Sequence, residues 1–99
     1  MLLAKVIGTV VATRKDDRMQ GQKLQIVQPV SLTDLSPDGK PLVAVDSVGA
    51  GEGEIVMVCA GSSARQTART KETPCDAVIM AIVDSLTLSG RQTYSKSQA

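Results

Sequence analysis

Residues 48–67, VGAGEGEIVMVCAGSSARQT, hold the residue types that could most readily do chemistry in this chain. Three glycines at alternate positions precede an apolar run, and Gly61-Ser62-Ser63 follows it. A glycine-rich turn can cradle a phosphate with its backbone N–H groups, and a serine next to a glycine after a strand can be a nucleophile. The segment therefore raises two hypotheses, anion binding and nucleophilic catalysis.

Neither hypothesis fits the spacing well. A phosphate-binding loop has its glycines after a strand and a Lys-Ser or Lys-Thr pair at the helix start, whereas here the glycines precede the strand and no lysine follows. Gly61-Ser62-Ser63 does follow a strand and can open a helix, so an anion could bind there beside Arg65. A nucleophilic serine would need a second glycine and a base, and the chain has no histidine.

The remaining reactive groups are carboxylates and thiols. An enzyme using carboxylates alone could employ Asp16-Asp17, but adjacent side chains diverge in an extended loop, which favours a solvated charged loop. Cys59 and Cys75 lack the spacing of metal ligands or of a disulfide framework and are expected to be reduced thiols. We therefore predict no catalytic residue, no cofactor, no metal site and no enzymatic activity.

Composition excludes other partners. Lys and Arg number 11 against 10 Asp and Glu, so no broad basic field attracts nucleic acid. Tyr94 is the single aromatic residue, although modules that bind nucleic acids by stacking need several. No apolar run approaches the roughly 20 residues that span a bilayer, and the amino end lacks a signal-peptide pattern. We expect a cytoplasmic protein with no membrane or nucleic-acid partner.

The order of apolar runs and turns predicts an all-β domain. Runs rich in β-branched residues predict five strands, at residues 2–13, 23–32, 42–48, 55–60 and 78–83, the last continuing to Leu88. In the second, Leu24 and Ile26 alternate with Gln25. A bend is expected at Gly8, and a short helix over residues 62–69 after a serine N-cap. This order is typical of a small five-stranded OB-like β-barrel over residues 1–88, followed by a polar, flexible tail over residues 89–99.

Two of these strands indicate self-association. The runs IVMVCA and VIMAIV are apolar at every position, whereas a strand with one face in water alternates. Both faces are therefore expected to be covered, and a chain of 99 residues has little material for this. Another copy of the chain is the natural cover; the alternative is that the helix and the long loops cover the outer face.

Five blocks in order resemble a known family. The block VGAGEGEIVMVCAGSSAR resembles the central signature of the bacterial microcompartment vertex proteins, the EutN/CcmL family. LAKVIGTVVATRK, GQKLQIVQP, AVDSVGAG and CDAVIMAIVDSL resemble the other family blocks, so that the resemblance spans residues 2–86. Each block is weak alone, but five in order are specific. Ala81 stands where many members have glycine, and Met19 where leucine is common.

The resemblance implies a structural role. Members form OB-like barrels that assemble as pentameric rings and close the vertices of polyhedral shells, whose flat facets are hexameric shell proteins; carboxysomes and catabolic compartments are examples. The alternative is an OB-type module that binds nucleic acid or a small ligand. The candidate residues for the subunit interface or ring axis are Val48, Gly49, Ala50, Gly51 and Glu54. The segment Ser62, Ser63, Ala64 and Arg65 is the candidate for assembly contacts, with Arg65 or Glu54 pairing across the interface or locally. Asp46 and Asp84, at strand ends, are expected to cap turns.

Overall fold

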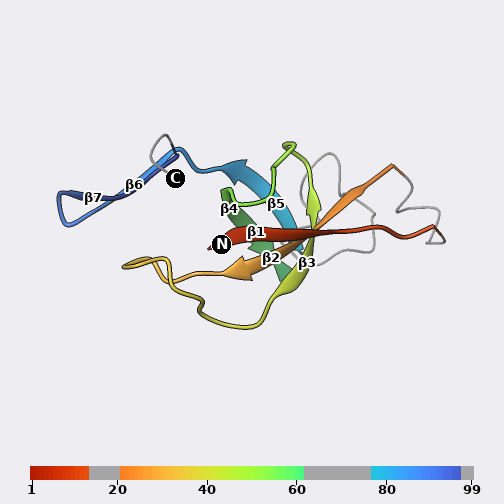
Figure 1. Cartoon of the computed structure of the whole chain (residues 1–99), viewed down its shortest axis with the longest axis horizontal. Helices are drawn as coiled ribbons and strands as arrows, with labels where there is room; N and C mark the ends of the chain where they lie inside the picture. The colour runs from red at the N-terminus through yellow and green to blue at the C-terminus, as the bar shows by residue number, and fades with distance from the viewer. Residues whose placement is uncertain (14–20, 62–76, 97–99) are drawn as a thin grey trace.

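The computed structural model of the chain describes residues 1–13, 21–61 and 77–96, and its secondary structure in these ranges is entirely β (Figure 1). The strands are β1 (Leu2–Val10), β2 (Lys23–Pro29), β3 (Leu42–Asp46), β4 (Ile55–Ala60), β5 (Ala77–Ile82), β6 (Ser85–Leu88) and β7 (Arg91–Ser95). The helix expected over residues 62–69 lies outside the described residues. Within those ranges no helix is present that could cross a membrane.

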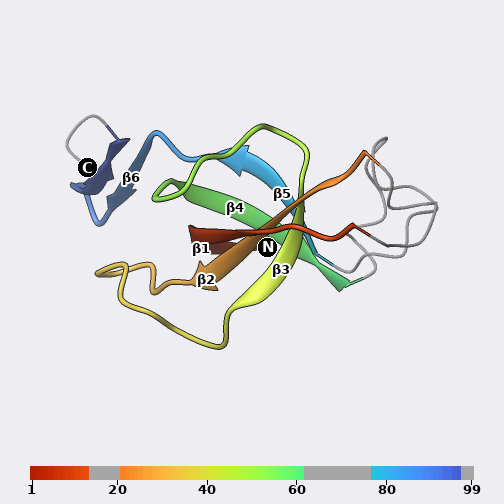
Figure 2. The same ribbon diagram turned by 45° about the vertical axis from the view of Figure 1, so that its right-hand side comes forward.

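Five strands close into a barrel in the order β1-β2-β3-β5-β4 (Figure 2), which confirms the predicted five-stranded barrel. All neighbours are antiparallel except β3 and β5, which pair in parallel through Val45 with Val78 and Asp46 with Ile79. A parallel pair needs a long crossover connection, and here the crossover includes β4 itself. The chain therefore forms β4, which lies between β1 and β5 in the closed barrel, before β5 pairs with β3.

Strand β1 bends, and different parts of it pair with its two neighbours, β4 and β2. Its first half, Leu2 to Lys5, pairs with β4, while Ala4 to Val10 pairs with β2. The pairing with β2 shifts register between Val6 and Gly8, at the predicted bend. A β-carbon at Gly8 would lie 3.4 Å from Cδ1 of Ile26, an ordinary contact distance, so the space beside β2 does not by itself require glycine at this register shift.

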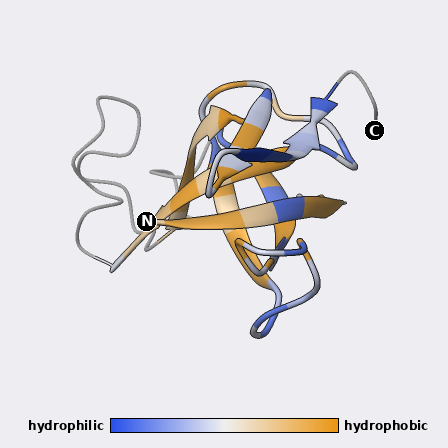
Figure 3. Cartoon of the chain, turned by 90° about the vertical axis from the view of Figure 1, so that its left-hand side faces the viewer, coloured by the Kyte–Doolittle hydropathy of each residue, from blue (hydrophilic) through white to orange (hydrophobic). Residues whose placement is uncertain are grey.

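The barrel interior is filled by small and β-branched side chains, and Figure 3 shows the apolar character of its strands. One cluster comprises Ala4, Val6, Val27, Ala44, Ala50, Val56, Val58, Ala77 and Ile79, each 2% exposed or less. Side chains of this size fill a narrow five-stranded barrel without voids.

Part of the outer wall of β4 is covered by the chain itself. Ile55 and Leu3 point away from the interior and are buried against Val30 and Val83. Leu35, Met57, Leu86 and Tyr94 pack around this outer cluster. Of the alternative that the helix and the long loops cover the outer face, the loop after β2 supplies part of the cover here, the unexpected β6–β7 hairpin supplies the rest, and the helix lies outside the described residues.

The β6–β7 hairpin differs from the sequence-based expectation. We expected one strand continuing to Leu88 and a polar tail from residue 89, but β5 ends at Ile82 and Arg91–Ser95 form β7, which pairs with β6. Ser89 and Gly90 both have positive φ, 54° and 78°, as the two-residue turn of a tight hairpin requires. The hairpin projects beyond one end of the barrel in Figures 1 and 2, and the chain measures 45 × 23 × 23 Å.

Candidate functional site

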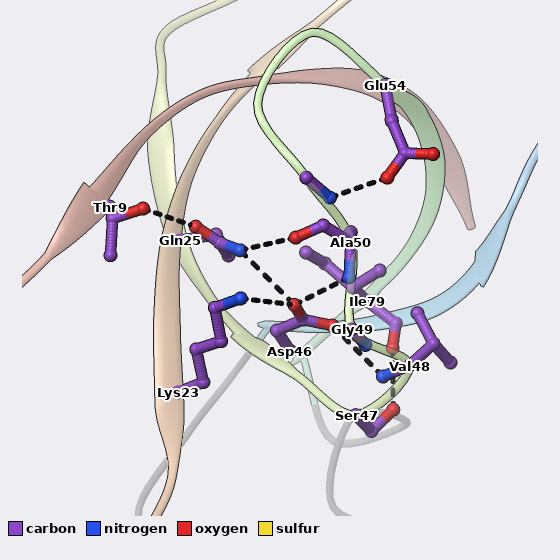
Figure 4. Close-up of polar contacts among 11 residues, drawn as sticks. Thr9, Lys23, Gln25, Asp46, Ser47, Val48, Gly49, Ala50, Glu54 and Ile79 are labelled. Atoms are coloured by element: carbon purple, nitrogen blue, oxygen red, sulfur yellow. Dashed lines mark hydrogen bonds and ion pairs between the residues drawn. The ribbon is translucent and has the colours of Figure 1, made fainter.

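The loop between β3 and β4 is held to the barrel by the carboxylate of Asp46, the last residue of β3 (Figure 4). Asp46 Oδ1 accepts hydrogen bonds from the N–H groups of Val48 at 3.0 Å and Gly49 at 2.9 Å. Its Oδ2 accepts a third from the N–H of Ala50 at 2.8 Å. The expected turn-capping role of Asp46 is thus confirmed, and three consecutive amides are fixed by one side chain.

Gln25 extends this network across the barrel interior. Its Nε2 donates to Asp46 Oδ2 at 3.2 Å and to the carbonyl oxygen of Ala50 at 2.7 Å, and its Oε1 accepts from Thr9 Oγ1 at 2.9 Å. Gln25 is 1% exposed and Asp46 4% exposed. Buried polar groups are tolerated when their hydrogen bonds are made, and both of these side chains meet that condition.

The position of Gln25 is a finding that the sequence pattern concealed. Its alternation with Leu24 and Ile26 suggested an apolar face opposite the glutamine, and the structure places the glutamine inside. Leu24 instead packs outside the barrel against Val45 and Val78. A polar residue at this interior position is explained by its hydrogen-bond partners Thr9, Asp46 and Ala50, the last two of which lie 21 and 25 residues further along the chain.

Each small residue of the loop has its own reason for being small. Ala50 is completely buried and belongs to the barrel's interior cluster. Gly49 has a φ of +77°, which side chains rarely adopt, while a β-carbon there would meet nothing within 4 Å. Glycine is favoured at position 49 by backbone conformation, and alanine at position 50 by the volume of the barrel interior.

A second fastening holds the far end of the loop. The N–H of Glu54 donates to the carbonyl oxygen of Gly51 at 3.1 Å, forming a turn in which Gly53 has a φ of +92°. Glu54 Oε1 accepts the N–H of Gly51 at 2.5 Å, and its other oxygen lies 2.6 Å from Nζ of Lys96. Lys96 follows β7 directly, so this ion pair ties the hairpin to the loop.

The ion pair shifts the pKa of both Glu54 and Lys96. The hydrogen bond from Lys96, followed by that from the Gly51 amide, lowers the pKa of Glu54 from its ordinary value of 4.5. Reciprocally, the hydrogen bond to Glu54 and its negative charge raise the pKa of Lys96 from 10.5. Both groups are therefore charged across the neutral range, and each favours the ionised state of the other.

The structure brings most of the interface candidates into this one loop. Val48, Gly49 and Gly51 lie on the surface at one end of the barrel, and Glu54 is half-buried beside Lys96. Ala50 is enclosed by its own barrel. Ser62, Ser63, Ala64 and Arg65 lie outside the described residues. The contribution of both segments to subunit contacts stays a prediction.

A cleft that no sequence signal indicated lies beside the amino terminus. Its volume is about 780 Å³, and its lining is mainly apolar, including Met1, Leu32, Met57 and Ile82. Asp38 and Asp84 are the two acidic residues among those that line it. Within the described residues the Asp84 side chain makes no hydrogen bond, while its backbone oxygen accepts the N–H of Lys96 at 2.8 Å, so the turn-capping role expected for Asp84 stays a prediction.

The contacts of this site hold parts of the chain in place. Among residues 1–13, 21–61 and 77–96, no group of three or more His, Cys, Asp or Glu side chains could hold a metal ion. Asp46 is buried, and both of its oxygens already accept hydrogen bonds. The arrangement fixes a loop and a hairpin on a barrel.

Comparisons with known proteins agree on one family. The family model described as "Ethanolamine utilisation protein EutN/carboxysome" matches residues 1–84. The microcompartment shell vertex protein GrpN of Rhodospirillum rubrum is 51% identical over 87 residues, covering 87% of this chain and 96% of GrpN. The microcompartment shell vertex protein EutN of Salmonella typhimurium is 38% identical over 96 residues, covering 97% of this chain and 96% of EutN.

Solved structures give the same result. The structure of Gloeobacter violaceus CcmL superimposes with a TM-score of 0.91 at 38% identity, covering 98% of this chain and 99% of CcmL. The GrpN pentameric microcompartment shell protein from Rhodospirillum rubrum has a TM-score of 0.79 at 48% identity, covering 89% of this chain and all of GrpN.

Proposed function

Since the chain belongs to the EutN/CcmL family, we propose that five copies form a ring that closes a vertex of a bacterial microcompartment shell. The observation that carries this proposal is its similarity, over the whole length of the relative, to the pentameric shell protein GrpN. The named relatives include vertex proteins of carboxysomes and of other microcompartments. The proposed role is structural, and we expect the protein to be located in the microcompartment shell, within the cytoplasm.

The fold supports assembly through side chains. The closed barrel has no free strand edge, so copies cannot join by extending the barrel sheet, and among the described strands only the two-stranded β6–β7 sheet has open edges. Several apolar side chains of the barrel and hairpin strands remain exposed, among them Val43, Met80 and Leu88. A five-fold ring repeats one heterologous contact, in which two different patches of the same chain meet.

The loop between β3 and β4 is held in place at both ends, which suits a position at the contact between subunits of the ring. Asp46 fixes three of its amides, and Glu54 fixes its far end to Lys96. The loop therefore presents Val48, Gly49 and Gly51 in one conformation, as a contact repeated five times requires. We place these residues near the subunit contacts or the ring axis.

The neighbours we propose for the ring are hexameric shell proteins. Six-fold tiles pave a flat sheet, and pentagonal units at the corners allow such a sheet to close. This role needs neither catalysis nor a cofactor. The alternative of an OB-type nucleic-acid or small-ligand module is not favoured by the family or by the near-balanced charge.

Native mass spectrometry of the purified chain tests the ring. We expect a dominant species of five times the 10.4 kDa of one chain. Co-expression with a hexameric microcompartment shell protein should then give closed polyhedral shells by electron microscopy, and open sheets or tubes without this chain. A monomer that persists at micromolar concentration, or shells that close equally well in its absence, would contradict the proposal.

A further inference from the structure

The side chain of Glu54 contacts two segments that are far apart in the sequence. One carboxylate oxygen accepts the N–H of Gly51, in the loop between β3 and β4, at 2.5 Å. The other lies 2.6 Å from Nζ of Lys96, which directly follows β7. Figure 4 shows the carboxylate directed toward the backbone of the loop. A single carboxylate therefore binds the loop and the end of the hairpin at the same time.

The backbone of Glu54 is fixed to the barrel, whereas its side chain is partly open to solvent. Its carbonyl oxygen accepts the N–H of Val6 at 3.0 Å, and the N–H of Gly53 donates to the carbonyl oxygen of Val6 at 2.8 Å. The Glu54 side chain is 21% exposed. Because the backbone is held on β1, the carboxylate can leave or regain its two partners by rotation of the side chain between rotamers.

The position of the hairpin depends on contacts between side chains. Among the described strands, β6 and β7 form a two-stranded sheet of their own, which does not pair with the barrel. Leu86 and Tyr94 pack on the outer cluster, and Lys96 adds its ion pair with Glu54. A two-stranded sheet is marginally stable by itself, so each of these contacts matters for holding the hairpin in place.

Gly51 depends on the same residue. Both of its backbone groups bond to Glu54, the N–H to the carboxylate and the carbonyl oxygen to the Glu54 N–H at 3.1 Å. A β-carbon at Gly51 would lie 3.3 Å from Glu54 Oε1, which is tighter than most contacts of a β-carbon. Glycine at this position therefore leaves room for the carboxylate in the orientation that binds the loop.

We infer that Glu54 couples the loop to the hairpin of the same chain, because one carboxylate orientation makes both contacts and loss of either contact loosens the other segment. Lys96 and the Gly51 amide favour the same orientation, so each contact strengthens the other. Such a coupling acts equally in both directions. Its consequence rests on the proposed function: with the loop at a contact of the ring, a neighbour that orders the loop also orders the hairpin.

Removing the lysine charge tests the coupling from the hairpin side. Lys96→Met retains an unbranched side chain but abolishes the ion pair. Partly exposed ion pairs are weak, so we expect the hydrogen exchange rate of the Gly51 amide, measured by NMR, to rise about two- to fivefold. Lys40→Met is the matched control, because Lys40 is exposed and forms no ion pair within the described residues. An unchanged Gly51 rate in Lys96→Met would contradict the coupling.

A substitution in the loop tests the reverse direction. Gly51→Ala should displace the carboxylate, and the amide of Lys96, which donates to the carbonyl oxygen of Asp84, should then exchange about two- to fivefold faster. Glu52→Ala is the control, because Glu52 is exposed in the same loop and forms no ion pair within the described residues. Faster exchange at Lys96 in both variants would show that the effect does not pass through Glu54.

Exchanging the two charges separates the coupling from general loosening. The double variant Glu54→Lys with Lys96→Glu can form the ion pair again, but a lysine side chain has no oxygen to accept the N–H of Gly51. We expect the amide at position 96 to regain its native exchange rate while the Gly51 amide stays fast. Recovery of both amides would show that the Glu54 carboxylate is not the link between them.

Failure of the coupling can be distinguished from failure of the ring. The exchange rates report contacts inside one chain, whereas native mass spectrometry reports the number of chains. A pentamer in which Lys96→Met leaves the Gly51 amide unchanged would overturn the coupling and leave the ring intact. A monomer with coupled amides would overturn the ring and the consequence for subunit contacts, while the coupling within the chain would stand.

Discussion

Replacing Asp46 by asparagine should release the loop between β3 and β4. The carboxylate accepts four hydrogen bonds, two at each oxygen, from the amides of Val48, Gly49 and Ala50 and from Gln25 Nε2. An asparagine side chain keeps one oxygen and presents an NH₂ group where the other stood. Whichever way the amide turns, a donor faces two donors.

The magnitude follows from those contacts. The cheaper orientation directs the NH₂ group toward Val48 and Gly49, whose donors are partly accessible to water, and keeps the oxygen for the buried Ala50 and Gln25. Hydrogen bonds to a charged group contribute about 1.5–3 kcal/mol each, part of which water restores at an accessible amide. We expect a loss of about 2–4 kcal/mol, a large part of the roughly 5–15 kcal/mol typical of a small domain.

Urea unfolding followed by circular dichroism measures this loss, at one fixed protein concentration because association stabilises the folded chain. Asp34→Asn is the matched control. Asp34 is exposed and receives both hydrogen bonds from Ser36 on a single oxygen, so an asparagine oxygen can accept both. That change should lower stability far less than Asp46→Asn does, because Asp34 is exposed and water can replace its contacts.

Hydrogen exchange provides the local readout. The amides of Val48, Gly49 and Ala50 should lose protection in Asp46→Asn, while strand amides far from the loop retain it. If Asp46→Asn unfolded at the same urea concentration as Asp34→Asn, with the three amides still protected, the assignment of Asp46 as the anchor of the loop would be refuted.

Three further predictions concern the same loop. Ala50→Leu should destabilise the chain by about 1–3 kcal/mol in urea unfolding because it overfills the barrel, and a neutral result would show that Ala50 has free space around it. Gly49→Ala should cost about 1 kcal/mol through its positive φ alone, with the same assay expected to show no change in fold; stabilisation would contradict the backbone argument. Glu54→Gln should reduce stability at neutral pH, because the lowered pKa of Glu54 contributes stability above 4.5 that is lost as pH falls through the folded-state value. The raised pKa of Lys96 contributes stability below 10.5 that is lost as pH rises through its folded-state value, so native and variant unfolding curves should converge at both extremes, and a pH-independent difference would be contrary evidence.

The strands of the barrel could be predicted because their signals are local. Runs of β-branched residues marked all five, and Gly8 marked the bend of β1. Asp46 at a strand end indicated a capped turn, since a short acidic side chain reaches the amides two to four residues ahead. These features depend on residues near one another in the sequence.

Features that depend on distant residues escaped prediction. The alternation around Gln25 appeared to have an apolar face opposite the glutamine because nothing nearby shows that Asp46 and Ala50 will meet that side chain inside the barrel. The β6–β7 hairpin was concealed by its polar composition, although Ser89-Gly90 is a tight-turn signal. Its position depends on Leu86 and Tyr94 packing beside Ile55, some 30 to 40 residues earlier in the chain.

The strand order has a kinetic consequence. Three of the five seams join strands that follow one another in the chain, whereas β1 with β4 and β3 with β5 join strands far apart. We expect β1-β2-β3 and β4-β5 to form as separate units and to dock at the two long-range seams in the slow step, since closing long loops delays non-local pairing. During translation, the barrel cannot close until β5 has emerged from the ribosome. Until then the apolar interior of the barrel is exposed to solvent. We therefore expect a subunit to assemble with other copies only after nearly the whole chain has been synthesised.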